Sequence, residues 1–257
     1  MSQSKGPSLS GRGAAVFAAA LALAGTSSLA HAQDQQQRRQ QPQAAPQPLY
    51  VASGATRYST PDGRVRFVFD RSGGRAALLQ FEGDPEVHVL RPSMAAGGGE
   101  IYQTENGAVQ LRVMPHDGII VYTRTMRTGS PASEEGRVDP LTPEAIAFAE
   151  MQDRFRQLQA QSRRRVGQTV LFTVPARMSA PTAGLVMDAA ERAAEGLAAA
   201  PMTTVRRVII TVGERPTAEL RGDVLLIEVA PQMGYAGRPS SNTIRNVVSG
   251  AVQGPEE

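Results

Sequence analysis

The residues best suited to bind a charged ligand alternate with apolar residues between positions 64 and 124. Val65, Phe67 and Phe69 alternate with Arg64, Arg66 and Asp70, and the same period of two recurs in the segments that follow. The face opposite the apolar one collects six candidate ligand residues: Arg64, Arg66, His88, Arg112, Tyr122 and Arg124. Planar guanidinium groups bind carboxylates and phosphates, so this face predicts an anionic or polar, glycan-like ligand. The alternative is the solvated side of an antiparallel sheet.

The scarcity of other reactive residues limits the catalytic chemistry. Lys5 is the only lysine, cysteine is absent, and only His88 and His116 follow residue 32. We therefore expect no Schiff-base lysine, no thiol nucleophile and no three-histidine metal site, and we predict no catalytic, cofactor or metal-binding residues. Paired carboxylates need none of these groups. An envelope-directed hydrolase is therefore the alternative function, with candidate carboxylates Glu86, Glu100 and Asp117.

Residues 1–32 have the three parts of a cleavable export signal. A start with Lys5 and Arg12 but no acid precedes the apolar run 14–24, and Ala30 and Ala32 form an A-x-A cleavage site. The apolar run is shorter than the ~20 residues that span a bilayer. We expect cleavage after Ala32 and a periplasmic or secreted protein without stable membrane insertion.

The charge balance after cleavage argues against nucleic-acid binding. Removing Lys5 and Arg12 takes the 27 cations to 25 arginines against 24 acids, a formal charge of +1. Nucleic-acid binding needs a clear excess of cations along the binding surface. The expected partner is instead an envelope polymer or protein.

The remaining sequence predicts an α+β fold in two parts behind a tether. Residues 33–48 are rich in Gln and Pro, lack apolar periodicity, and are expected to form a disordered tether. Residues 49–127 contain six short strand patterns separated by turns such as Asn106-Gly107, which predicts an antiparallel β-meander, either a curled sheet or a small barrel. The residues expected to face its core are Val65, Phe67, Phe69, Leu79, Phe81, Val87, Val89, Leu111, Val113 and Val121.

The second part is expected to be a small sheet covered by helices, over residues 141–257, after a linker at 128–140. Thr142-Pro143-Glu144 has the residue types of a helix start, and that helix should end near Gly167. The arginines at 163–165 would then favour its C-terminus. Further strands are expected at 169–174, 205–212 and 219–229, with helices at 181–199 and after Ser240 or Ser241.

Two stretches resemble a known family. They are residues 66–92 with the continuation 100–122, and residues 205–248, which include the run Ala236-Gly237-Arg238-Pro239-Ser240-Ser241. They resemble an uncharacterised domain-of-unknown-function family of exported proteins from Gram-negative bacteria, over most of the chain after the Gln/Pro tract. The resemblance implies an envelope location and assigns no catalytic or binding residue. The run itself indicates a loop that leads into a helix cap.

Overall fold

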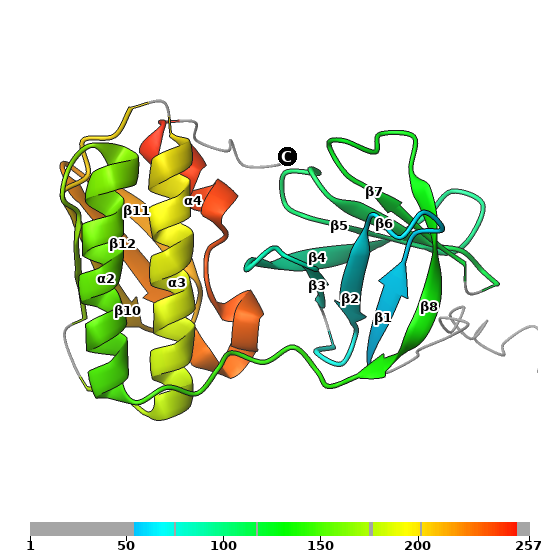
Figure 1. Ribbon diagram of the computed structural model, residues 1–257, viewed down its shortest axis with the longest axis horizontal. Helices are drawn as coiled ribbons and strands as arrows, with labels where there is room; N and C mark the ends of the chain where they lie inside the picture. Colours follow the sequence, from blue (N-terminus) through cyan, green and yellow to red (C-terminus); the bar gives the residue numbers. More distant parts are fainter. Residues whose placement is uncertain (1–53, 75, 117, 175–176, 201, 251–257) are drawn as a thin grey trace, which may run out of the picture. The chain divides into compact units, whose positions relative to one another are not determined.

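The computed structural model describes residues 54–74, 76–116, 118–174, 177–200 and 202–250. The predicted export signal with Ala30 and Ala32, the predicted tether at 33–48, and Asp117 lie outside these residues. The described residues form a closed β-barrel followed by an α+β part with a second sheet (Figure 1). No helix within the described ranges has both the length and the apolar character to cross a membrane.

Eight antiparallel strands form the barrel. They are β1 (Ala55–Ser59), β2 (Arg66–Asp70), β3 (Ala77–Phe81), β4 (Val87–Met94), β5 (Glu100–Gln103), β6 (Gln110–Val113), β7 (Ile119–Tyr122) and β8 (Ser130–Val138). Strands β2 to β7 correspond to the six predicted strands. Alternate side chains fill the interior, including Phe67, Phe69, Leu79, Leu90, Leu111 and Val121. Of the two predicted forms of the meander, the structure is the closed barrel.

Strand β8 closes the barrel and occupies most of the segment predicted to be a linker at 128–140. It pairs with β1 through Ala55 to Ser59 and with β7 through Ile119 to Val121. None of its nine residues is buried on either face. The segment therefore lacks the apolar alternation by which a strand is recognised in sequence, and the expectation of an unpaired linker there is wrong.

The face of strand β4 that points into the barrel is the opposite of the one predicted. Leu79, in the barrel core, pairs with His88, and directly paired residues share a face. His88 and Leu90 therefore lie on the interior side, whereas Val87 and Val89 lie on the outer side. Val87 is nevertheless only 1% exposed, because the segment after the second sheet packs against β4. An apolar residue on the outside of the barrel is thus explained by a second packing surface.

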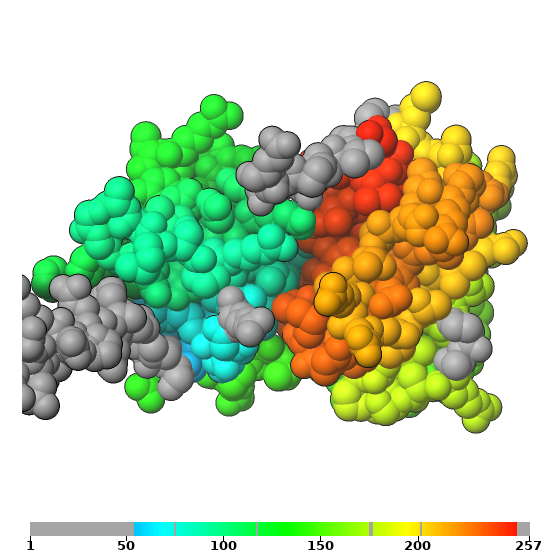
Figure 2. Space-filling model, turned by 180° about the vertical axis from the view of Figure 1, so that it is seen from behind, coloured from blue at the N-terminus to red at the C-terminus, as the bar shows by residue number. Residues whose placement is uncertain are grey.

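The α+β part contains α2 (Phe148–Val166), β9 (Leu171–Thr173), α3 (Ala180–Ala199), β10 (Arg207–Val212), β11 (Thr217–Arg221), β12 (Val224–Val229), the 3-10 helix η1 (Pro231–Gly237) and α4 (Ser241–Val248). The strand order is β11-β12-β10-β9, with only β11 antiparallel to its neighbour. Helices α2 and α3 lie side by side over one face of the sheet (Figure 1), and α4 packs on α3 and β11. Viewed from behind, the orange segment of the sheet is at the surface (Figure 2).

Two elements of this part differ from their predicted bounds. The first helix begins at Phe148 and not at Thr142, because the preceding residues run beside the start of α3, where the Ile146 N–H donates to the Ala180 carbonyl at 3.2 Å. It ends at Gly167, as predicted, with a left-handed φ of 79°. The segment 219–229 is not one strand. It turns at Gly222, with φ of 62°, so that β11 and β12 form a hairpin.

Candidate functional site

The run from Gly237 to Ser241 connects η1 to α4, and most of its residues have a structural role that the geometry makes clear. A Cβ atom on Gly237 would lie 2.0 Å from the Ala230 carbonyl oxygen, so a larger residue does not fit without movement of the backbone. Ser240 is the N-cap of α4, and its hydroxyl accepts a hydrogen bond from the Thr243 N–H at 3.0 Å. The predicted loop leading into a helix cap is therefore confirmed.

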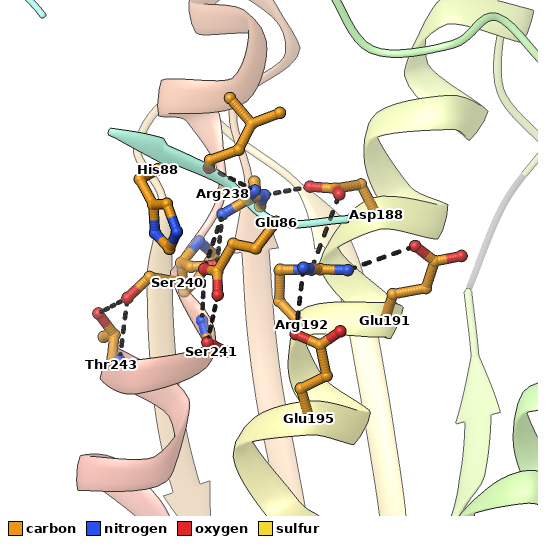
Figure 3. Close-up of polar contacts among 12 residues, drawn as sticks. Glu86, His88, Asp188, Glu191, Arg192, Glu195, Arg238, Ser240, Ser241 and Thr243 are labelled. Carbon is orange, nitrogen blue, oxygen red and sulfur yellow. Dashed lines mark hydrogen bonds and ion pairs between the residues drawn. The ribbon is translucent and has the colours of Figure 1, made fainter. Parts of the chain in front are cut away.

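Arg238 links three elements through a side chain that is only 1% exposed. Its Nε donates to the carboxylate of Asp188 on α3, and its Nη2 donates to the Val87 carbonyl oxygen of β4 at 3.0 Å. Its Nη1 lies 3.8 Å from Oε1 of Glu86. The guanidinium also lies over the ring of Tyr235 in η1, 5.7 Å from its centre. Figure 3 shows the Arg238 side chain between Glu86 and Asp188.

Glu86, directly before β4, is committed to the start of α4. Its Oε1 accepts from the Ser241 N–H at 3.2 Å, and its Oε2 accepts from the Ser241 hydroxyl (Figure 3). A carboxylate at a helix N-terminus is favoured because the first N–H groups point toward it with partial positive charge. Because both oxygens are occupied, this side chain is a structural acceptor in the observed arrangement.

A second buried arginine extends the cluster along α3. The Arg192 side chain is 1% exposed and lies 3.7 Å from Asp188, 3.5 Å from Glu191 and 3.1 Å from Glu195. Asp188 therefore lies between two buried cations. Burial raises the pKa of Glu195; Arg192 opposes the shift, and the carboxylate of Glu86 adds to it. Burial likewise raises the pKa of Glu191.

A cavity of about 470 Å³ adjoins this cluster. This size lies within the range of small-molecule binding sites. Its barrel side includes Glu86, His88, Arg91, Glu105 and Arg124, and its other side includes Glu195, Arg238, Ser240, Ser241, Thr243 and Arg245. Among the described residues, no three carboxylate or imidazole groups are grouped as a metal ion would require.

The charged groups of the cavity are unevenly paired. Glu105 accepts from the Thr243 hydroxyl at 3.0 Å, and Glu195 and Glu86 are held as described above. By contrast, the side chains of Arg91 and Arg124 form no hydrogen bond or ion pair with any described residue. The cavity therefore has two guanidinium groups available to a ligand, while each of its three carboxylates already has a partner.

The six residues of the predicted ligand face are distributed around the barrel. Arg64 lies beside Asp62 in the β1–β2 turn at 3.6 Å, and Arg66 lies 3.5 Å from Glu135 and 3.8 Å from Glu82. Arg112 of β6 and Tyr122 of β7 lie on the outer side, opposite the buried Leu111 and Val121. Only two of the six line the cavity, and these are His88 and Arg124.

The carboxylates of the predicted hydrolase do not share one location. Glu86 lines the cavity, whereas Glu100 accepts a hydrogen bond from the Tyr102 hydroxyl at 2.7 Å and is not part of the lining. Burial raises the pKa of Tyr102 to about 12, which keeps this hydroxyl a donor. Asp117 lies outside the described residues.

Sequence reasoning missed Arg91 and Arg238. Arg91 belongs to β4, whose interior and exterior residues were predicted in the opposite sense. Arg238 had a signal in sequence, because an arginine between Gly237 and Pro239 leads directly into the predicted cap. The local sequence predicts a loop at this position, and nothing in it indicates that the Arg238 side chain is buried.

The closed barrel, the helix-covered sheet and the buried arginine cluster define a two-part α+β protein with a polar cavity. The family model described as Domain of unknown function (DUF4908) matches residues 28–248. The chain therefore belongs to this family, which confirms the predicted resemblance to a domain-of-unknown-function family. Neither the curated proteins nor the solved structures contain a significant match to this chain.

Proposed function

We propose that this protein is an exported, non-enzymatic binding module of the bacterial envelope that holds an acidic group of a polar polymer in the 470 Å³ cavity. The observation that carries the proposal is the pair Arg91 and Arg124, which line the cavity without a partner among the described residues. Their unpaired state contrasts with the carboxylates around them, each of which has a partner. The cavity thus has hydrogen-bond donors that lack an acceptor, which a ligand could supply.

The chemistry of the lining favours a carboxylate or phosphate on a ligand that also carries neutral polar groups. Hydrogen bonds between guanidinium and an ionised acceptor are stronger than those between neutral groups. Thr104, Asn106 and Thr217 also line the cavity and supply hydroxyl and amide groups. A glycan bearing carboxylates matches this combination. His88, which lies 3.4 Å from Asp84, also lines the cavity.

Export rests on the sequence of residues 1–32, with its positive start, apolar centre and Ala-x-Ala ending. An envelope location would place the cavity among polymers of this chemistry. It also fits the absence of cysteine, because the fold then needs no particular redox state.

The test is a binding measurement with purified peptidoglycan sacculi and with soluble muropeptides, which carry carboxylates. Arg91→Gln combined with Arg124→Gln should weaken binding by roughly 100-fold or more, since hydrogen bonds to a charged group contribute about 1.5–3 kcal/mol each. Arg66→Gln with Arg112→Gln removes the same charge from the barrel surface outside the cavity and should leave binding unchanged. Loss confined to this second variant would move the site to the predicted sheet face. No binding by the unaltered protein would overturn the proposal.

A hydrolase is the second candidate, and Glu195 is the observation that favours it. Its carboxyl group lines the cavity, and its pKa is raised by burial, as a general acid requires. The same incubations test this candidate when soluble products are followed by mass spectrometry. Release of fragments by the unaltered protein and not by Glu195→Gln would establish the hydrolase, whereas binding without release supports the binding module.

A further inference from the structure

Two separate segments bring five arginines to one end of the α+β part. Arg163, Arg164 and Arg165 occupy the last turn of α2, and Arg206 and Arg207 lie at the start of β10. We call these five residues the basic edge. The end of a helix explains the first three through its dipole, but it does not explain Arg206, directly before β10, or Arg207, its first residue.

Hydrogen bonds hold the two segments together. The side-chain amide of Gln168, three residues after Arg165, donates to the carbonyl oxygens of Thr203 and Val205 at 3.1 and 2.9 Å. The Leu171 N–H donates to the Arg206 carbonyl at 2.9 Å. The end of α2 and the start of β10 are therefore neighbours in space although some forty residues separate them.

The basic edge has a clear excess of positive charge. All five arginines are exposed, and none forms a hydrogen bond or ion pair through its side chain with another described residue. The adjacent acid is Asp223, whose carbonyl accepts from the Arg206 N–H at 2.8 Å. Glu219, on the neighbouring hairpin, is already paired with Arg221 at 2.8 Å. One unpaired acid thus faces five unpaired cations.

An apolar side chain accompanies these cations. Met202, in the segment that leads to β10, is 86% exposed. Figure 2 shows the yellow segment near residue 200 projecting at the surface of the α+β part. An exposed apolar residue beside a cluster of arginines is typical of proteins that lie on an anionic bilayer, because the cations contact headgroups while the apolar group enters the acyl region.

We propose that the basic edge docks reversibly on an anionic phospholipid surface. The guanidinium groups bind headgroup phosphates, and Met202 enters the boundary between headgroups and acyl chains. This surface is separate from the cavity, because none of the five arginines nor Met202 lines the cavity. Met202 also favours a bilayer over a nucleic acid, whose phosphate backbone offers no apolar region for it.

The test is sedimentation with vesicles of phosphatidylglycerol and phosphatidylcholine in equal parts, compared with phosphatidylcholine alone. The full chain is expressed and all variants share the same background, so that any contribution of the N-terminal residues cancels. An arginine near an anionic membrane changes the partition constant about fivefold. Arg163→Gln, Arg164→Gln and Arg165→Gln together should therefore weaken binding to the mixed vesicles about 100-fold, and Met202→Ser should weaken it further.

The matched control removes the same charge from exposed barrel arginines without a described partner, through Arg57→Gln, Arg127→Gln and Arg137→Gln. It should bind as the unaltered protein does. If the change in the last turn of α2 disturbs folding, Arg206→Gln with Arg207→Gln provides an independent test, with an expected loss of about 25-fold.

Four outcomes would overturn the proposal. Equal binding to both kinds of vesicle would exclude recognition of anionic lipid, and an equal loss in the barrel control would show a response to net charge alone. Displacement from vesicles by inorganic phosphate at the lipid-phosphate concentration, or equally tight binding to duplex DNA, would show a general anion site. The proposal is supported if the unaltered protein prefers anionic vesicles and only the basic-edge variants lose this preference.

Discussion

Glu86 accepts hydrogen bonds from both the N–H and the hydroxyl of Ser241, a residue 155 positions later in the chain. The contact joins the residue before a barrel strand to the first residue of α4. It places a carboxylate where the helix has unpaired N–H groups. The barrel and the last helix are thus connected by a polar contact that neither segment could form alone.

Replacing Glu86 by Ala should reduce the free energy of unfolding by roughly 2–4 kcal/mol, because two Ser241 donors and the buried guanidinium of Arg238 lose an acceptor. Glu105→Gln is the control, since this exposed carboxylate accepts one hydrogen bond from Thr243 and should cost no more than about 0.5 kcal/mol. Urea unfolding measures both variants. Equal effects would show that burial of Glu86 has no energetic consequence.

Arg238 and Asp188 should show strong energetic coupling. In a double-mutant cycle with Arg238→Met and Asp188→Asn, we expect an interaction energy of about 1–3 kcal/mol from thermal or urea unfolding. The exposed pair Arg221 and Glu219 provides the comparison, and exposed pairs contribute no more than about 1 kcal/mol. Additive effects of the two changes at 188 and 238 would contradict a buried ion pair.

Gly237→Ala tests the close approach at the loop before α4. The new Cβ would lie 2.0 Å from the Ala230 carbonyl oxygen, so the backbone must move and carry Arg238 away from Val87. Overpacking of this kind costs about 1–3 kcal/mol. In Gly73→Ala, the nearest atom would be 3.4 Å away, and we expect little change in the unfolding midpoint. A stable Gly237→Ala protein would show that the loop yields easily.

Glu195 should make stability depend on pH above the ordinary glutamate pKa of 4.5, because its pKa in the folded protein is raised by burial. The folded state then holds a proton that the unfolded state has released, so this group lowers the free energy of unfolding as the pH rises from 4.5 to the raised value. Glu195→Gln should lack this decrease when unfolding is measured across that range.

Glu219→Gln is the control of opposite sign. The hydrogen bond from Arg221 lowers the pKa of Glu219 below 4.5. The contribution of Glu219 to the free energy of unfolding is therefore present above pH 4.5 and is lost as the pH falls through the lowered value. Parallel pH profiles for the unaltered protein and Glu195→Gln would contradict the buried position of this carboxylate.

Strands β2 to β7 could be predicted from sequence, whereas β1 and β8, which pair with each other to close the barrel, could not. Phe67 and Phe69 are two residues apart and flanked by Arg66 and Asp70, and this period predicts β2 correctly. Strand β8 has no buried residue, and its pairing with β1 depends on barrel closure, which no local pattern encodes. In β4, the alternation identified a strand but not which of its faces points inward, because Val87 is buried from outside.

The candidate site was less predictable than the fold, because it depends on contacts between distant segments. His88 and Arg124 were among the predicted ligand residues and do line the cavity. Arg91 was missed through the orientation of β4. The buried position of Arg238 depends on Asp188, Glu86 and Val87, which lie 50 or more residues away. Charge alone marks an arginine as a surface residue, and only tertiary contacts show otherwise.

The pairing of Ala55 with Val138 also governs the order in which the chain can fold. Until residue 138 has emerged, β1 is an unprotected strand edge that can pair with another molecule. Closing a loop of more than eighty residues is slow compared with forming hairpins. A chain delivered from its N-terminus therefore passes through an aggregation-prone interval. This interval ends only when the nine-residue strand β8, which closes the barrel, becomes available.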